Sequence, residues 1–403
     1  MFRYKILLFA IACLAVSSSC FAITDEAIFR SFEFSFLNPG ARSGAMGGAF
    51  IALADDATAA EANPAGLPIL TKPEVSVEYR HTETNANELN SLRVINPPGL
   101  GFGFLLNTFN EIEDQDQPSF VSVVYPASNW VFGFSRQEFV KQDALVNESV
   151  LTQLGDITAI INSNGSTQQD IVNWNFSLGV KLSESFSLGT TVRYSQLDWQ
   201  AETENIFDFV IPGVPTDPLV GSVTSIDDSD SAVGFNVGAI WKSKHASFGL
   251  VYKYNPTFEV TEHEEGLIVP EGRPTEFTNT LNVPDTFGGG IAIKPNDTLT
   301  VSADVTYIKF SDLEDNFQAG HSVFTLVYEP GEITFKVDNG FDYRVGTEFI
   351  VFLGNVPVAL RAGYYRKASN SVVTDFIADR FPADPIILPL VFAERDDTNH
   401  FTF

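Results

Sequence analysis

The stretch IVNWNFSLGVKLSESFSLGTTVRYSQ, residues 171–196, alternates apolar and polar side chains along two segments. A short polar turn at Ser183 and Glu184 separates the segments. The apolar positions are Val172, Trp174, Phe176, Leu178, Val180 and Leu182, then Phe186, Leu188, Val192 and Tyr194. Period-two spacing with one apolar face predicts two antiparallel strands joined by a tight turn.

The same alternation recurs along the chain and predicts an all-β protein with eleven full strands. The predicted strands are 73–81, 118–125, 129–140, 171–182, 185–200, 232–243, 246–260, 280–294, 298–310, 341–353 and 356–367. The last residues, DDTNHFTF, read as the start of a twelfth strand. A soluble β-sandwich would alternate in the same way, so the choice of class rests on other features.

Two further features favour a transmembrane barrel over a soluble sandwich. Tight turns alternate with long polar segments, which is typical of outer-membrane barrels. The long segments are 82–117, 141–170, 201–231, 261–279, 311–340 and 368–397. The tryptophans fit two interfacial girdles, with Trp130 and Trp241 near the tight turns and Trp174 and Trp199 at the opposite ends of their strands.

Two of the long segments carry apolar residues. Segment 141–170 has them at helical spacing, which predicts an amphipathic helix; they are Val146, Val150, Leu151, Leu154, Ile157 and Ile161. Segment 201–231 is apolar for a loop and predicts either an extracellular binding groove or loop packing over the barrel. The groove residues are Ile206, Phe207, Phe209, Val210, Ile211 and Leu219.

Composition and the N-terminus narrow the class of function. The net charge of −27 argues against nucleic acid as a partner. Residues 1–22 have the basic start, apolar centre and small-residue end of a cleaved signal peptide, so we expect an exported protein. The two cysteines, Cys13 and Cys20, both lie in this leader, which leaves the mature chain without disulfides. No metal-ligand spacing or nucleophile motif is found, so we expect no metal, no cofactor and no enzymatic activity.

The stretch NPGARSGAMGGAFIALADDATAAEANPAGL, residues 38–67, resembles the N-terminal hatch of the FadL/TodX (long-chain fatty acid transporter) family of outer-membrane proteins. The resemblance implies a transmembrane antiparallel β-barrel whose lumen is plugged by a small helical hatch. We accordingly expect a signal peptide at 1–22, a hatch at 23–72 and a barrel at 73–403. The family has fourteen strands, so this chain, with eleven or twelve, is expected to lack its last strands.

The resemblance also implies a function and site residues. Hydrophobic compounds, such as fatty acids or aromatic hydrocarbons, would be captured at the extracellular loops, enter a lumenal pocket closed by the hatch, and leave laterally into the membrane. The implied sites are the hatch motif Asn63, Pro64 and Ala65; a lateral gate at Gly133; and lumenal charges at Arg193, Arg344 and Arg361. Phe29, Phe32, Phe34 and Phe36 either reach the pocket or pack the hatch against the wall.

Localisation and partners follow from the same resemblance. We expect a monomer in the outer membrane of a Gram-negative bacterium, in contact with membrane lipid and lipopolysaccharide. The alternative is a barrel of the same family that does not transport and serves a secretion system as an adaptor.

Overall fold

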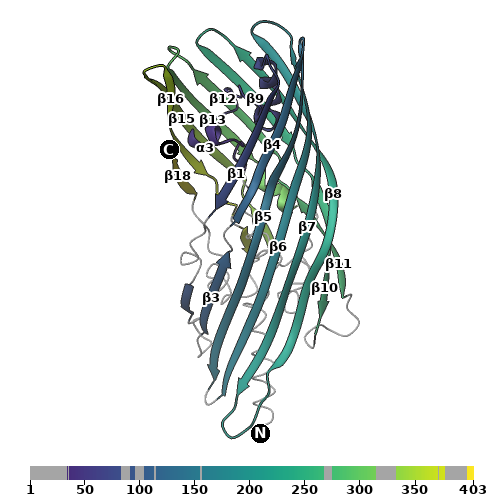
Figure 1. Cartoon of the computed structure of the whole chain (residues 1–403). Coiled ribbons are helices and arrows are strands. Elements are labelled where there is room, and N and C mark those ends of the chain that lie inside the picture. The colour runs from purple at the N-terminus through teal and green to yellow at the C-terminus, as the bar shows by residue number, and fades with distance from the viewer. Residues whose placement is uncertain are drawn as a thin grey trace.

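The computed structural model describes residues 34, 36–82, 91–95, 104–112, 115–154, 157–266, 275–314, 333–370, 372–376 and 397–403. A large antiparallel sheet curls around a small helical hatch near one end (Figure 1). Within these residues no helix has the length and apolar character needed to cross a membrane. The predicted signal peptide, residues 1–22, lies outside the described residues.

Twelve strands form the continuous path of the sheet, in an order that follows the chain. They are β1 (Glu74–Thr82), β4 (Gln115–Ala127), β5 (Trp130–Leu154), β6 (Ile157–Lys181), β7 (Phe186–Val210), β8 (Leu219–Lys242), β9 (Ala246–Tyr254), β12 (Thr286–Ile293), β13 (Leu299–Ile308), β15 (Gly340–Leu353), β16 (Val356–Lys367) and β18 (Thr398–Thr402). β1 and β18 are the two ends of this path and do not pair with each other. The predicted class is confirmed, and β18 is the expected twelfth strand.

Four further strands join the sheet beside this path, and two lie in a separate small sheet. The four are β2 (Ser91–Ile95), β3 (Phe104–Ile112), β10 (Thr257–Glu265) and β11 (Glu276–Asn282); the separate pair is β14 (Ile333–Val337) and β17 (Val372–Phe376). The helices are α3 (Ala41–Ala45), α4 (Ala59–Ala62), η1 (Pro64–Ile69) and η3 (Phe310–Glu314). The predicted strand 246–260 is divided into β9 and β10 by Asn255 and Pro256.

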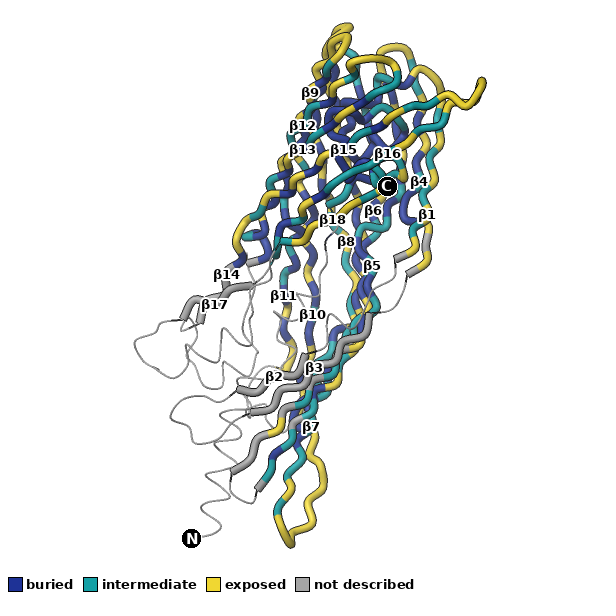
Figure 2. Tube along the Cα trace, turned by 90° about the vertical axis from the view of Figure 1, so that its left-hand side faces the viewer, coloured by how far each residue is buried: buried dark blue, intermediate teal, exposed yellow. Residues whose placement is uncertain are grey.

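The outer face of the sheet is apolar around the hatch end, and the inner face is buried (Figure 2). On β7 the outward residues Phe186, Leu188, Val192 and Tyr194 are exposed, whereas the inward residues 187, 189, 191 and 193 are buried. From Gln196 to Glu204 the outward positions of β7 are polar. The apolar stretch is thus about as tall as the lipid-facing band of an outer-membrane barrel.

One of the four tryptophans was placed wrongly in the predicted girdles. Trp130, Trp174 and Trp241 are exposed on the outer face, but Trp199 is 3% exposed and faces the lumen. Its indole Nε1 donates to Thr167 Oγ1 at 3.2 Å. The odd-numbered residues of β7 face the lumen. Trp199 therefore faces inward, although its distance from the turn would suit the expected girdle.

The predicted helix in 141–170 was also wrong. β5 and β6 pair continuously across this segment, from Lys141–Asp170 to Leu154–Ile157. The expected loop 201–231 is likewise mostly strand, since β7 runs to Val210 and β8 begins at Leu219. A single short helix is marginal in water, whereas two matching segments form a full ladder of backbone hydrogen bonds.

Candidate functional site

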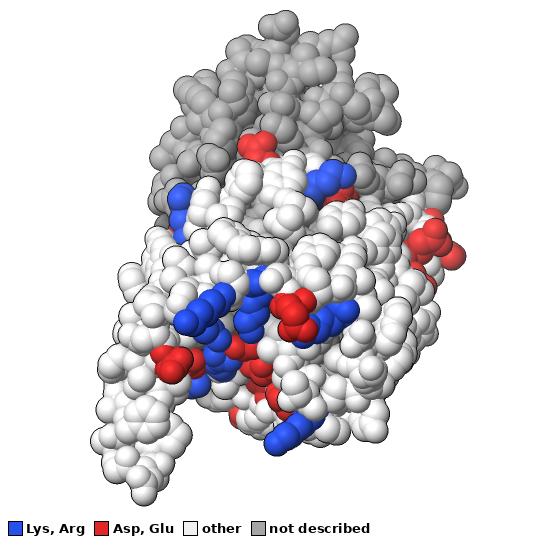
Figure 3. All heavy atoms as spheres, turned by 90° about the horizontal axis from the view of Figure 1, so that it is seen from above, with Lys and Arg blue, Asp and Glu red and all other residues white. Residues whose placement is uncertain are grey.

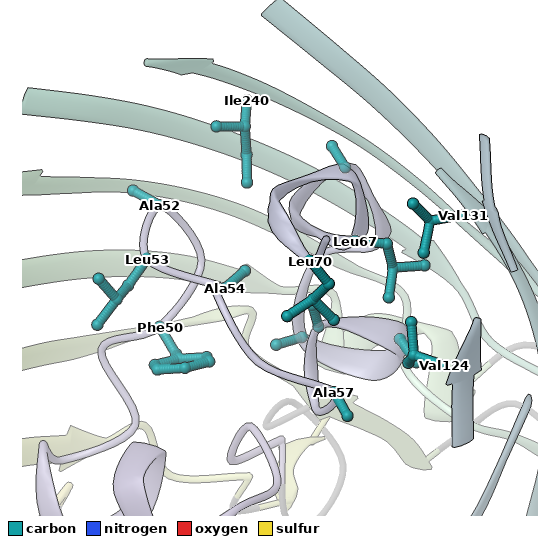
Figure 4. Packing of buried hydrophobic residues seen from close by; sticks show 14 of the residues in the cluster. Phe50, Ala52, Leu53, Ala54, Ala57, Leu67, Leu70, Val124, Val131 and Ile240 are labelled. Carbon is teal, nitrogen blue, oxygen red and sulfur yellow. The ribbon is translucent and has the colours of Figure 1, made fainter. Parts of the chain in front are cut away.

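The hatch lies inside the curved wall at the end where the tight turns lie (Figure 1), and Figure 4 shows its buried side chains beside those of the wall. Its side chains are small, and most are buried against one another and against the wall. The hatch members of this cluster are Met46, Phe50, Ala52, Leu53, Ala54, Ala57, Ala59, Ala60, Ala62, Ala65, Leu67 and Leu70, and the wall members are Val124, Val131, Ile240 and Ala292. Small residues let a compact turn-rich segment fit within the width of the lumen.

The predicted motif Asn63-Pro64-Ala65 joins the two helical turns of the hatch. Asn63 Oδ1 accepts from Ala65 N at 3.1 Å and so caps η1, while Pro64 occupies its first turn. Asn63 Nδ2 donates to the Ile51 carbonyl at 3.0 Å and to the Leu250 carbonyl of β9 at 3.3 Å. One side chain therefore shapes the hatch and fixes it to the wall.

Glycines on the inner face let the wall approach the hatch backbone closely. A Cβ at Gly189 would lie 2.2 Å from the carbonyl carbon of Pro64, and one at Gly238 would lie 2.0 Å from Asn63 Oδ1. Further glycines whose Cβ would meet the hatch backbone are Gly179, Gly249, Gly346 and Gly363. These positions have no room for a side chain, so glycine is required by contact with the hatch.

A buried charge layer lies on the side of the hatch facing the long-loop end. Glu61 of α4 accepts from Arg193 NH2 at 2.8 and 2.9 Å, through its two oxygens, and from Lys253 Nζ at 2.8 Å. Glu61 is 3% exposed and Arg193 is 2% exposed. Burial alone would raise the pKa of Glu61, but the charges of Arg193 and Lys253 outweigh burial and hold this pKa below its ordinary value.

The second predicted cation, Arg344, is also buried and faces the lumen. Its NH2 donates to Asp342 Oδ2 at 2.7 Å and to the Phe36 carbonyl at 3.0 Å. The guanidinium lies 5.1 Å from the ring centroid of Tyr365. Arg344 therefore positions the backbone at Phe36, just before α3.

The third predicted cation, Arg361, belongs to a chain of ion pairs at the hatch end. Its Nε donates to Glu348 Oε2 at 2.7 Å, and Arg42 of the hatch donates to both oxygens of the same carboxylate at 2.9 Å. Arg42 also pairs with Asp55, which accepts from Lys294 Nζ at 3.0 Å. These contacts fasten the hatch to β15 and to the turn after β12.

An apolar cluster occupies the lumen beyond the charge layer. We call it the lumenal apolar cluster; it comprises Phe34, Val140, Ile171, Leu197, Trp199, Ile226, Phe258, Val260, Leu281, Val283, Ile308, Phe310, Leu313, Val337 and Ala368, with Phe36 and Phe139 packed against it. Along β7 the inward residues pass from Arg193 of the charge layer to Leu197 and Trp199 of this cluster. Polar and apolar levels thus alternate along the lumen.

Two of the four predicted pocket phenylalanines lie in this cluster. Phe34 is 2% exposed, and its ring centroid is 6.0 Å from that of Phe36 and 6.2 Å from that of Phe139. Phe29 and Phe32 lie outside the described residues. The chain at Phe34 and Phe36, just before α3, therefore enters the apolar part of the lumen.

Gly133, the position expected for the lateral gate, shows no shift of register with either neighbouring strand. Gly133 pairs in register with Val124 on β4 and Ser177 on β6, and its α-carbon faces Ala60 of the hatch. A Cβ at Gly133 would lie 3.4 Å from Ala60 Cβ, which is an ordinary contact, so Gly133 faces the hatch with more room than the other inward glycines. The register of β5 shifts instead between Glu138 and Val140.

A discontinuity of the wall accompanies this register shift. The pairing of β4 with β5 ends at Phe120–Gln137, and the pairing of β3 with β5 covers Ile112–Ala144 onward. The strand beside β5 on this side therefore changes from β4 to β3 across residues 138–143. Phe139 lies at this discontinuity and contacts both Phe34 and Phe36.

The predicted extracellular groove residues lie at the tip of the β7–β8 hairpin. Phe207 is 7% exposed and lies over Gly221, whereas Val210 and Leu219 are 51% and 50% exposed. Ile206, Phe209 and Ile211 are half-buried. The six residues lie together at the tip of one hairpin.

Sequence reasoning missed Glu61, Lys253 and Phe139. Glu61 is the single acidic residue within the Ala-rich stretch 57–67, which is a usable signal for a buried partner. Lys253 follows the inward parity of β9, but its partner is 192 positions away in the sequence. Within the described residues, no group of three His, Cys, Asp or Glu side chains is placed to hold a metal ion.

Comparison with known proteins supports the resemblance drawn from the hatch. Residues 22–371 match the family described as outer membrane protein transport protein (OMPP1/FadL/TodX). No curated protein sequence matches.

Solved structures match at low sequence identity. The monoaromatic hydrocarbon channel CymD has a TM-score of 0.51 at 14% identity, covering 85% of this chain and 87% of that one. A Pseudomonas aeruginosa FadL homologue gives 0.49 at 12% identity, with 85% and 91% covered. The P. putida toluene transporter TodX gives 0.49 at 13% identity, with 90% and 87% covered. At these identities the CymD match supports the fold alone.

Proposed function

Because this chain belongs to the OMPP1/FadL/TodX family of outer membrane transport proteins, we propose that it is an uptake channel for hydrophobic compounds, with long-chain fatty acids as substrates. The observation that carries the proposal is the order of layers in the lumen. From the long-loop end toward the tight turns, the apolar cluster comes first, the buried charge layer second, and the hatch packed against the wall third. An apolar chain with one anionic end matches this order.

The apolar part of the route would begin at the β7–β8 hairpin tip. Its exposed side chains, Val210 and Leu219, offer a first contact for a lipid in water. The acyl chain then enters the lumenal apolar cluster, displacing Phe34 and Phe36. Each methylene that leaves water contributes about 0.8 kcal/mol, so a long chain gains more than a short one.

The charge layer favours a carboxylate over a neutral hydrocarbon. Arg193 and Lys253 face one carboxylate, Glu61, which leaves one positive charge in excess in this group. A fatty acid headgroup would offset that charge, whereas toluene would not. CymD is described as a monoaromatic hydrocarbon channel, so aromatic substrates are the comparison to run.

We place the lateral exit at the discontinuity of β5. An axial exit would require the hatch to leave the lumen, against the contacts of Asn63, Glu61 and Arg42. A ligand beside Phe139 would instead lie next to the place where the strand beside β5 changes from β4 to β3. The proposed position of the gate is therefore 138–143 of β5, in place of Gly133.

Uptake of radiolabelled long-chain fatty acid tests the proposal in a Gram-negative host that lacks its own transporter. We expect Phe139→Ala to change the uptake rate several-fold. Phe134→Ala should not, because Phe134 is on the same strand but faces lipid at 50% exposure. Surface expression is checked for each variant.

Two results would contradict the proposal. Uptake of toluene without uptake of fatty acid would overturn the substrate. A folded protein that transports neither and is recovered with a secretion protein would favour the adaptor function.

A further inference from the structure

A shallow hollow with a cavity volume of about 30 Å³, open to solvent, lies at the hatch end of the molecule. It separates the hatch from two neighbouring turns of the wall, those after β8 and after β12. Its charged lining residues are Lys242, Lys244, Lys294 and Asp55, and His245 lies beside them. Figure 3 shows this end of the molecule, where Lys and Arg side chains gather around a few carboxylates.

The hollow carries a local surplus of positive charge. Three lysines line it against one carboxylate, Asp55, which already pairs with Lys294 and with Arg42. Neither Lys242 nor Lys244 forms an ion pair with any described carboxylate. The chain as a whole has a net charge of −27, so the hollow is locally positive in a protein whose net charge is negative. An anionic ligand would relieve it.

The frame that holds these lysines is fixed by hydrogen bonds. The backbone N–H of Lys294 donates to the His245 carbonyl at 2.8 Å and joins the two turns. Ser247 Oγ donates to the Ala52 carbonyl at 2.8 Å and joins the wall to the hatch. The cations are therefore carried on a preformed rim, which lowers the cost of gathering them around a ligand.

The rim also lies at the edge of the apolar outer face. Trp241 directly precedes Lys242, is 45% exposed, and has its ring centroid 5.6 Å from that of Phe248. Tryptophan beside lysine at the end of an apolar band is typical of a membrane interface. In an outer-membrane barrel the tight turns face the periplasm, so this is the level of the inner-leaflet phosphates.

From these observations we propose that the hollow binds the phosphodiester headgroup of an anionic phospholipid of the inner leaflet. The headgroup reaches over the rim to Lys242, Lys244 and Lys294, and the acyl chains lie along Trp241 and Phe248. The proposal rests on the outer-membrane location and not on transport, so the site is independent of the substrate. Basic pockets on membrane proteins recognise such headgroups through charge and hydrogen bonds.

Native mass spectrometry of the whole protein in detergent tests the site, with phosphatidylglycerol, phosphatidylcholine and inorganic phosphate as probes. The test variant is Lys242→Gln/Lys244→Gln, which leaves Lys294 and its contact with the hatch in place. The matched control is Lys181→Gln, on another turn at the same end, where Lys181 pairs with Glu184. We expect the double variant to lose about 30-fold in phosphatidylglycerol affinity.

Three outcomes would overturn the proposal. The first is equal binding of phosphatidylglycerol and phosphatidylcholine to the wild type. The second is the same loss in Lys181→Gln as in the double variant, since this would mean a diffuse effect of charge. The third is complete displacement of phosphatidylglycerol by an equal concentration of inorganic phosphate, which would make the hollow a site for free anions.

Discussion

Replacing Glu61 by Gln should loosen the hatch without changing its shape. Gln has the same size and keeps an acceptor, but it removes the negative charge that faces Arg193 and Lys253 at 2.8 Å. Breaking a buried ion pair from one side costs about 3 to 5 kcal/mol, because the remaining charge stays buried without compensation. We expect the lower end of this range, since two cations share the retained hydrogen bonds.

Hydrogen exchange of the hatch measures this cost directly. A loss of about 3 kcal/mol in the free energy of opening should speed exchange of peptide amides in 53–67 by about 100-fold or more. The matched control is Glu184→Gln, because Glu184 pairs with Lys181 on the surface and its side chain is 94% exposed. The control should exchange at the wild-type rate. A Glu61→Gln hatch that exchanges within three-fold of wild type would refute our account of the charge layer.

The same contact predicts a dependence of stability on pH. The pKa of folded Glu61 is below its ordinary value, so its contribution is fully present above about pH 4.3, the ordinary pKa of Glu. The contribution is lost as the pH falls through the lowered pKa of the folded state. The thermal midpoint of the wild type in detergent should therefore fall more steeply below that pH than the midpoint of Glu61→Gln. Parallel curves would contradict the assignment.

Three further substitutions test the seating of the hatch. Gly189→Ala places a Cβ against hatch backbone, at 2.2 Å, and should raise single-channel conductance in planar bilayers, whereas Gly289→Ala, whose nearest neighbour is a side chain at 3.4 Å, should not. Asn63→Ala removes a cap and two hydrogen bonds and should lower the free energy of unfolding by about 1 to 3 kcal/mol in denaturant titrations; no change would contradict the role of the motif. Arg42→Gln removes the partly exposed ion pair of the hatch with Glu348 of β15, and its effect on hatch exchange should shrink as salt is added. An effect that does not depend on salt would mean that packing, and not charge, explains the loss.

Local periodicity determined most of the fold. Alternation in 171–196 was sufficient to predict the part of β6 from residue 171 onward, the turn after it and the inward face of β7, because side chains in a strand change sides at every residue. The resemblance of 38–67 to the FadL/TodX hatch likewise predicted a small helical hatch. The helix predicted in 141–170 failed because a spacing of three or four residues in a short segment does not outweigh a matching partner strand.

The tertiary structure alone decided which residues meet in the lumen. Parity assigns Arg193 and Lys253 to the inner face, but the stagger of β7 against β9 and the depth of the hatch bring both to Glu61, which is 132 and 192 positions away. The shift at Glu138–Val140 is equally invisible in the sequence, because a register shift depends on the partner strands as much as on β5 itself. The amino-acid sequence by itself therefore fixed the faces of the strands and the presence of a hatch. Which inward residues lie at the same height in the lumen depends on the register between neighbouring strands. Only the packing of strand against strand decides this register, since it belongs to a pair of strands and not to one strand alone.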